Sequence, residues 1–156
     1  MPGLPDYEGV ALQAIATVAV LLAAGEGTRL YPHTHERPKC LVEVGGRPLL
    51  DRALAALEQV GVAEVVIVTG YREEVLARWL AERDSKIKVT LVRNEVYAST
   101  NNAYSLWTAR VAVPGAFVLL DGDLLFEPAV LTTLLASAGE AALAVERRRD
   151  LGDEEM

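Results

Sequence analysis

The sequence has few residues that are reactive by themselves, with one cysteine and two histidines among its 156 residues. A single cysteine, Cys40, excludes an intramolecular disulfide, and a free thiol suits a reducing compartment, so we expect a cytoplasmic protein. The two histidines, His33 and His35, have no cysteine or carboxylate partner at zinc-ligand spacing. We therefore expect both histidines to be solvated loop residues.

Basic residues are also scarce. The chain has 15 Lys and Arg against 22 Asp and Glu, which gives a formal net charge of −7. This balance argues against a general affinity for nucleic acid or for anionic membranes. An anionic ligand would need a local basic cluster or a metal ion.

No apolar run has the length of a typical membrane span. Only Gln13 and Thr17 interrupt the stretch 10–24, but it is short for a span and lacks a preceding basic region, since Asp6 and Glu8 are the charges before it. We expect no membrane insertion. Residues 1–14 are interpreted as an N-terminal extension, and the second half of the apolar stretch as a buried strand.

Apolar runs alternate with helical patterns along the chain. The predicted strands are Thr17–Ala24, Val65–Thr69, Ile87–Val92, Phe117–Leu120 and Ala141–Val145. The predicted helices are Pro48–Val60, Arg72–Arg83, Asn102–Arg110 and Pro128–Ala136. Trp79 and Trp107 fall at helical spacing with other apolar residues, which predicts that both belong to the core. This alternation favours an α/β fold of the Rossmann-like, doubly wound kind, with a mainly parallel sheet and helices on both faces.

In such sheets, ligands bind beyond the carboxyl ends of the strands, where the strand order reverses. If the first strand is central, with the second and third on one side and the fourth on the other, the crevice lies between strands one and four. Gly25 follows the first strand and Asp123 follows the fourth. We therefore expect these two stretches to face each other.

A long irregular connection, residues 25–47, follows the first strand, and such connections are usually functional when they are ordered. It is not a P-loop, because no Gly-Lys-Ser/Thr follows, and Leu30 replaces the third glycine of a dinucleotide fingerprint. Glycines at 25 and 27 would still let backbone amides converge on an anion, with Arg29 and Lys39 adding positive charge. The connection carries a net charge of +1 and the rest of the chain −8. The alternative is a tight turn with solvated arginines.

The segment "LAAGEGTRLYPHTHERPKCLVEVGGRPLL", residues 22–50, resembles the opening motif of the nucleotidyltransferases that make sugar nucleotides and related activated alcohols. The family pattern G-x-G-T-R-L-x-P-x-T-x-x-x-P-K is matched at every fixed position from Gly25 to Lys39. The resemblance continues, more loosely, as far as Asp123. It implies a nucleotide-diphospho-sugar transferase-like (GT-A-like) version of the fold for residues 15–156.

The resemblance also implies roles for individual residues. The loop after the first strand would wrap a nucleoside triphosphate, through Leu22, Ala23, Ala24, Gly25, Glu26, Gly27 and Thr28. Arg29 would hold the departing pyrophosphate and Lys39 would bridge the reacting phosphates. The phosphate of the acceptor is already ionised, so its attack needs no general base, and catalysis is mostly positioning and charge neutralisation.

Two aspartates follow the fourth predicted strand in "VLLDGDLLF", residues 118–126. Carboxylate and phosphate oxygens are the ligands that Mg²⁺ prefers. Asp123 aligns with the metal-binding aspartate of the family, and Asp121 is a second candidate ligand. One alternative is a plain Asp-Gly turn. Another is the Asp-x-Asp pair of metal-dependent GT-A glycosyltransferases, whose pattern lacks the 25–39 loop.

The segment "RNEVYASTNNAYSLWTAR", residues 93–110, resembles the "TNN-x-YSL" stretch of the phosphocholine and inositol-phosphate cytidylyltransferase branch. The resemblance implies CTP as the favoured nucleotide and a phosphorylated small alcohol as the acceptor. Thr100, Asn101 and Asn102 are then candidate acceptor-binding residues, at a helix N-terminus that favours anions. Helix capping alone is the alternative. Asn94 and Gly70 are candidate nucleotide-binding residues, although Gly70 also suits an ordinary turn after a strand.

Members of this family are usually longer, and their later part supplies a second metal-binding aspartate and much of the acceptor pocket. We therefore expect this chain to be truncated at its C-terminus. A sugar-1-phosphate nucleotidyltransferase and a non-catalytic nucleotide-binding or regulatory module are alternatives to a cytidylyltransferase. A homodimer and a fusion to further domains both stay open.

Overall fold

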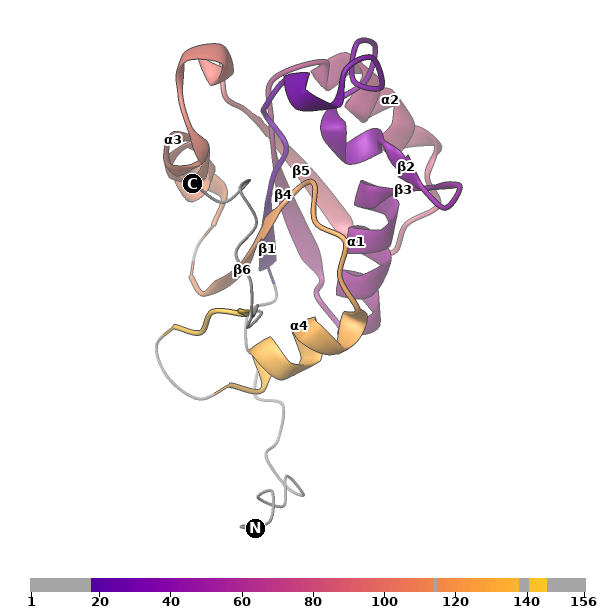
Figure 1. Ribbon diagram of the computed structural model, residues 1–156. Coiled ribbons are helices and arrows are strands. Elements are labelled where there is room, and N and C mark those ends of the chain that lie inside the picture. Colours follow the sequence, from indigo (N-terminus) through magenta and orange to yellow (C-terminus); the bar gives the residue numbers. More distant parts are fainter. Residues whose placement is uncertain (1–17, 114, 138–140, 146–156) are drawn as a thin grey trace, which may run out of the picture.

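The computed structural model describes residues 18–113, 115–137 and 141–145. Its centre is a four-stranded sheet in the order β5-β4-β1-β6 (Figure 1). The strands are β1 (Val18–Leu22), β4 (Glu64–Thr69), β5 (Lys88–Arg93) and β6 (Phe117–Asp121). All three neighbouring pairs are parallel. The predicted parallel sheet, with the first strand inside it and the fourth alone on one side, is confirmed.

Helices cover both faces of the sheet, as expected. Figure 1 shows α3 on one face and α1, α2 and α4 on the other. The bounds are α1 (Leu49–Gln59), α2 (Glu73–Glu82), α3 (Asn102–Ala109) and α4 (Pro128–Leu135). Each lies within one or two residues of its predicted range. No helix of the described residues is long and apolar enough to cross a membrane.

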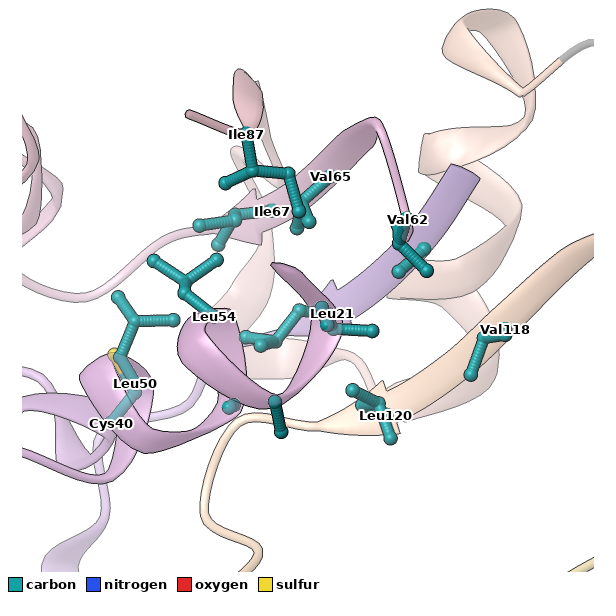
Figure 2. Close-up of a cluster of buried hydrophobic side chains, with 14 of the residues drawn as sticks. Leu21, Cys40, Leu50, Leu54, Val62, Val65, Ile67, Ile87, Val118 and Leu120 are labelled. Atoms are coloured by element: carbon teal, nitrogen blue, oxygen red, sulfur yellow. The ribbon is translucent and has the colours of Figure 1, made fainter. Parts of the chain in front are cut away.

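The larger core lies between the sheet and α1. Strand residues with one orientation, such as Leu21 and Ile67, meet Leu50, Leu54 and Leu57 of α1, and all five side chains are fully buried (Figure 2 labels four of them). Burying one such side chain stabilises the fold by about 1.5–3 kcal/mol. This packing gives a rigid base for the loops at the carboxyl ends of the strands.

The connection after β1 contains more local structure than the sequence predicted. It folds into two 3₁₀ turns, η1 (Thr28–Leu30) and η2 (Lys39–Leu41), followed by a small antiparallel hairpin, β2 (Glu43–Val44) and β3 (Arg47–Pro48). Two further 3₁₀ turns, η3 (Tyr97–Ser99) and η4 (Arg110–Ala112), flank α3. The connection is therefore an ordered part of the fold.

Two predictions were wrong. Residues 141–145 form no strand, and Leu143 and Val145 are more than 80% exposed. An apolar run needs a neighbouring strand to hydrogen-bond with, and the described residues provide none there. Trp107 is 53% exposed, because α3 packs on the sheet through the small residues Ser105 and Ala109 on its opposite side. The N-terminal extension 1–14 lies outside the described residues.

Candidate functional site

A pocket of about 390 Å³ opens at the carboxyl ends of β1 and β6, within the range of about 300–1,000 Å³ that is common for small-molecule sites. The loop after β1, the turn η2, the start of α3 and the turn after β6 all contribute to it. Its lining residues are Leu22, Ala23, Gly25, Gly27, Thr28, Arg29, Leu30, Lys39, Cys40, Asn102, Asp121, Gly122 and Asp123. The pocket thus lies where the sequence predicted it, between the first and fourth major strands.

The glycine loop is held in place by a contact that only glycine allows. Gly27 has a left-handed backbone (φ 65°), and an added Cβ there would lie 3.1 Å from the Cβ of Lys39 and 3.2 Å from a methyl carbon of Thr34. The buried hydroxyl of Thr34 donates a hydrogen bond of 2.9 Å to the carbonyl of Gly27. The fold therefore fixes the loop against the segment that carries Lys39.

Gly25 has different surroundings. It is exposed and lines the pocket, and an added Cβ would meet no atom within 4 Å. Packing within the protein therefore does not require glycine at this position. The open space leaves the backbone of Gly25 accessible to a ligand in the pocket.

A third glycine brings the two aspartates close to β1. The amide of Gly122 donates a hydrogen bond of 2.8 Å to the carbonyl of Leu22, and an added Cβ would lie only 2.7 Å from that oxygen. A larger residue would push the turn away from the strand. Gly122 is thus the reason why Asp121 and Asp123 reach the same pocket as the glycine loop.

Charged groups of both signs meet in the pocket. The ammonium of Lys39, on η2, forms an ion pair with the carboxylate of Asp123, 84 positions later in the chain. Both side chains are partly exposed, at 29% and 37%. Arg29 is exposed in the lining, and no ion pair joins it to a carboxylate of the described residues. Its guanidinium is therefore available for an anionic ligand.

Asp121 lies beside this ion pair. Its carboxylate accepts a hydrogen bond of 3.0 Å from the side-chain amide of Asn102, the first residue of α3. Partial burial, with the negative charge of Asp123 added, raises the pKa of Asp121 above its usual value, although Lys39 opposes the shift. Two neighbouring carboxylates, one of them with a raised pKa, form a site that a cation would stabilise.

These residues fit a magnesium ion that is shared with a phosphate ligand. The described part of the chain has no cluster of three or more His, Cys, Asp or Glu that could hold a metal by itself. Mg²⁺ usually binds through one or two carboxylates, substrate phosphates and water. Asp121 and Asp123 supply the carboxylates, which leaves the other positions for a ligand and solvent.

Three other predicted site residues, Asn94, Thr100 and Asn101, do not line the pocket. Asn94 is 1% exposed, and its side-chain amide donates to the hydroxyls of Thr100 (3.0 Å) and Ser105 (3.1 Å), so it holds the start of α3 from below. Asn101 caps that helix by accepting a hydrogen bond from the amide of Tyr104. The side-chain oxygen of Asn101 therefore acts as a helix cap, as the alternative interpretation of this segment predicted.

Ala24, Glu26 and Gly70 are also outside the lining. Gly70 packs so closely that an added Cβ would lie 2.6 Å from the ring of Tyr97 and 2.7 Å from the carbonyl oxygen of Ala24. That carbonyl accepts a hydrogen bond of 2.9 Å from the amide of Tyr71. These contacts join the end of β4 to the glycine loop. That Ala24, Glu26 and Gly70 take part in nucleotide binding stays a prediction.

The sequence did not single out Cys40, Leu30 or Gly122 as residues of the pocket wall. The Asp-Gly-Asp step could have identified Gly122, because glycine between two exposed polar residues often indicates a close backbone approach. The thiol of Cys40 is 1% exposed, and burial, with a smaller contribution from Asp123, raises its pKa to about 12. A thiol that stays protonated in this way is a packing residue and not a nucleophile.

The chain is similar in sequence and fold to several known proteins. CMP-5'-(3-aminopropyl)phosphonate synthase of Streptomyces rubellomurinus is 40% identical over 86% of this chain and 21% of its own length. Choline-phosphate cytidylyltransferase of Streptococcus pneumoniae is 38% identical over 70% of this chain and 46% of its own. The structure of the inositol-1-phosphate CTP transferase from T. maritima superposes with a TM-score of 0.70 at 27% identity, over 81% of this chain and 51% of that protein.

The chain therefore spans less than half the length of these two curated relatives. Residues 19–153 match the model of a family described as the MobA-like NTP transferase domain. This match covers most of the chain, including the glycine loop, Lys39 and both aspartates. The protein belongs to the MobA-like NTP transferase domain family.

Proposed function

We propose that the protein to which this chain belongs transfers CMP from CTP to a phosphorylated small alcohol and releases pyrophosphate. The observation that carries the proposal is the pocket itself, where a glycine loop, Arg29 and Lys39 face two carboxylates at the carboxyl ends of β1 and β6. The cytidylyltransferase relatives and the 100–102 segment at the pocket edge favour CTP and this acceptor class.

The reaction needs little covalent chemistry from the protein. An ionised phosphate oxygen of the acceptor attacks the α-phosphorus of CTP and forms a new P–O bond. The bond from the α-phosphorus to the bridging oxygen breaks, and pyrophosphate leaves with that electron pair. No proton has to be removed from the acceptor, so no general base is needed.

The residues of the pocket neutralise and orient the phosphates. Gly25, Gly27 and Arg29 line the pocket. The backbone amides of this glycine loop would donate to the polyphosphate, and the guanidinium of Arg29 would bind two oxygens of the departing pyrophosphate. Lys39, released from Asp123, bridges the reacting phosphates. Asp121 and Asp123 would hold Mg²⁺, which when bound would neutralise charge on the phosphates.

We place the acceptor at the N-terminus of α3, where Asn102 lines the pocket and Thr100 and Asn101 precede it. A phosphocholine or inositol-phosphate headgroup meets the polar edge of the pocket there. Because the reaction consumes a nucleoside triphosphate and the chain's one thiol is unpaired, we place the protein in the cytoplasm.

Pyrophosphate release tests the proposal most directly. The protein to which this chain belongs is incubated with Mg²⁺ and each of CTP, UTP, ATP and GTP, with phosphocholine, inositol phosphate or glucose 1-phosphate as acceptor. We expect turnover with CTP and a phospho-alcohol, and a loss of at least about 10²-fold in Arg29→Ala because a charge contact made in the transition state is removed.

Arg37→Ala is the matched control, because Arg37 is an exposed arginine of the same connection that does not line the pocket. This variant should keep the activity of the wild type. A preference for UTP with glucose 1-phosphate would instead indicate a sugar-1-phosphate nucleotidyltransferase. Binding of Mg-CTP without turnover of any acceptor would indicate a binding module, and a preference for a nucleotide diphosphate-sugar would indicate a glycosyltransferase.

A further inference from the structure

Asn102 connects the predicted acceptor-binding segment, residues 100–102, to the predicted metal ligand Asp121. It is the first residue of α3, whose N-terminus faces the proposed acceptor, and its amide nitrogen lies 3.0 Å from a carboxylate oxygen of Asp121. A carboxylate that accepts such a bond is restricted in its rotation about the Cβ–Cγ bond. Its other oxygen then points in a defined direction.

The start of α3 is itself held firmly. Buried Asn94 donates from below to Thr100 just before the helix and to Ser105 one turn into it. Asn101 caps the helix through its side-chain oxygen, and Ser105 and Ala109 pack it against the sheet. Asn102 is thus an exposed residue at the start of a firmly packed helix. A change in its side chain should therefore leave α3 in place.

The two carboxylates repel each other in the absence of a cation. The carboxylate of Asp123 has a partner in Lys39, whereas the described side chains give Asp121 only one hydrogen bond, from Asn102. The side-chain amide of Asn102 is therefore the described side-chain contact that orients the Asp121 carboxylate next to Asp123. Residues of this kind, which orient a metal ligand, affect metal affinity by about 10–100-fold in known sites.

We propose that Asn102 is a positioning residue that acts through Asp121, so that the acceptor-side helix α3 and the cation site of the pocket are coupled. This inference rests on the proposed function, since it assumes that the aspartate pair binds a divalent cation. It predicts that cation affinity depends on Asn102 only while Asp121 keeps its carboxylate.

A double-mutant cycle with Mn²⁺ as the probe tests this coupling, with binding to the CTP-loaded chain measured by electron paramagnetic resonance and corrected for Mn²⁺ bound by free CTP. Asn102→Ala should weaken Mn²⁺ binding about tenfold, as should Asp121→Asn. In the Asp121→Asn background, Asn102→Ala should have no further effect. Thr108→Ala, which removes the hydrogen bond from the Thr108 hydroxyl to the Tyr104 carbonyl on the same helix, is the control and should bind Mn²⁺ like the wild type.

Circular dichroism and thermal unfolding of each variant separate loss of fold from loss of the site. Asn102→Ser keeps a small donor and should recover part of the affinity. Unchanged Mn²⁺ binding in Asn102→Ala, or the same loss in both backgrounds, would overturn the inference. No Mn²⁺ binding to the wild type would overturn it as well, while the assignment of base and acceptor would still be decided by the pyrophosphate assay.

Discussion

Two glycines of the loop after β1 have opposite reasons to be glycine, although one residue separates them. Gly27 has a positive φ and is in contact with Lys39 and Thr34, so the fold requires it. Gly25 has open space where its Cβ would be, and it lines the pocket. Stability and ligand binding therefore depend on different positions of the same short motif.

Alanine substitutions separate these two roles. Gly27→Ala should lower the free energy of unfolding by about 1–2 kcal/mol, because an L-residue is strained at this φ. Gly25→Ala should leave the unfolding midpoint in urea unchanged and weaken CTP binding at least tenfold, since the added methyl group occupies space needed by the phosphates. Equal loss of stability in both variants would contradict this assignment.

At the scale of elements, Arg83 joins α1 to the end of α2. Its guanidinium donates to Asp51 (2.9 Å) and to Glu58 (3.0 Å), two acids of α1, and only 11% of its side chain is exposed. Partial burial alone would raise the pKa values of both acids, but in Asp51 the hydrogen bonds from Arg83 and Arg47 reverse this effect. In Glu58, the hydrogen bonds from Ser85 and Arg83 reverse the effect of burial. The pKa values of both carboxyl groups are therefore lowered.

A carboxyl group whose pKa is lower in the folded than in the unfolded chain stabilises the fold at pH values above its unfolded-state pKa. That stabilisation is lost as the pH falls through its folded-state pKa. Arg83→Met should cost about 2 kcal/mol of unfolding free energy at pH 7. The difference from the wild type should shrink below about pH 4, where both acids take up protons. Urea unfolding at several pH values measures this.

Lys88→Met is the control, because the exposed Lys88–Glu64 pair should contribute less than about 1 kcal/mol. A difference between Arg83→Met and the wild type that is the same at pH 7 and pH 3 would show that the arginine acts by packing and not through its charge.

The sequence allowed most elements to be predicted because hydrophobic spacing records which face of a strand or helix is buried. It predicted the bounds of α3 but not its buried side, where the small residues Ser105 and Ala109 pack and Trp107 is exposed. It failed again at 141–145, because a strand depends on a neighbour that composition cannot reveal. The Asn94 contacts and the Asn102–Asp121 bond likewise depend on tertiary placement, so they could not be inferred from spacing.

At the scale of the whole molecule, an acidic chain brings two basic side chains, Arg29 and Lys39, into one pocket beside two carboxylates. The net charge of −7 repels a free nucleoside triphosphate, whereas Arg29 and Lys39 attract it locally. The ion pair between Lys39 and Asp123 joins the two sides of the pocket before a ligand arrives. Binding of a cation to the aspartates would free Lys39 for the phosphates, so we expect the cation and the nucleotide to assist each other.

Calorimetric titration of CTP, with and without Mg²⁺, measures whether the cation and the nucleotide assist each other in this pocket. We expect saturable binding of one CTP per chain, at least tenfold tighter with Mg²⁺, and at least tenfold weaker in Arg29→Ala than in Arg37→Ala. CTP binding that is indifferent both to Mg²⁺ and to the loss of Arg29 would contradict this expectation.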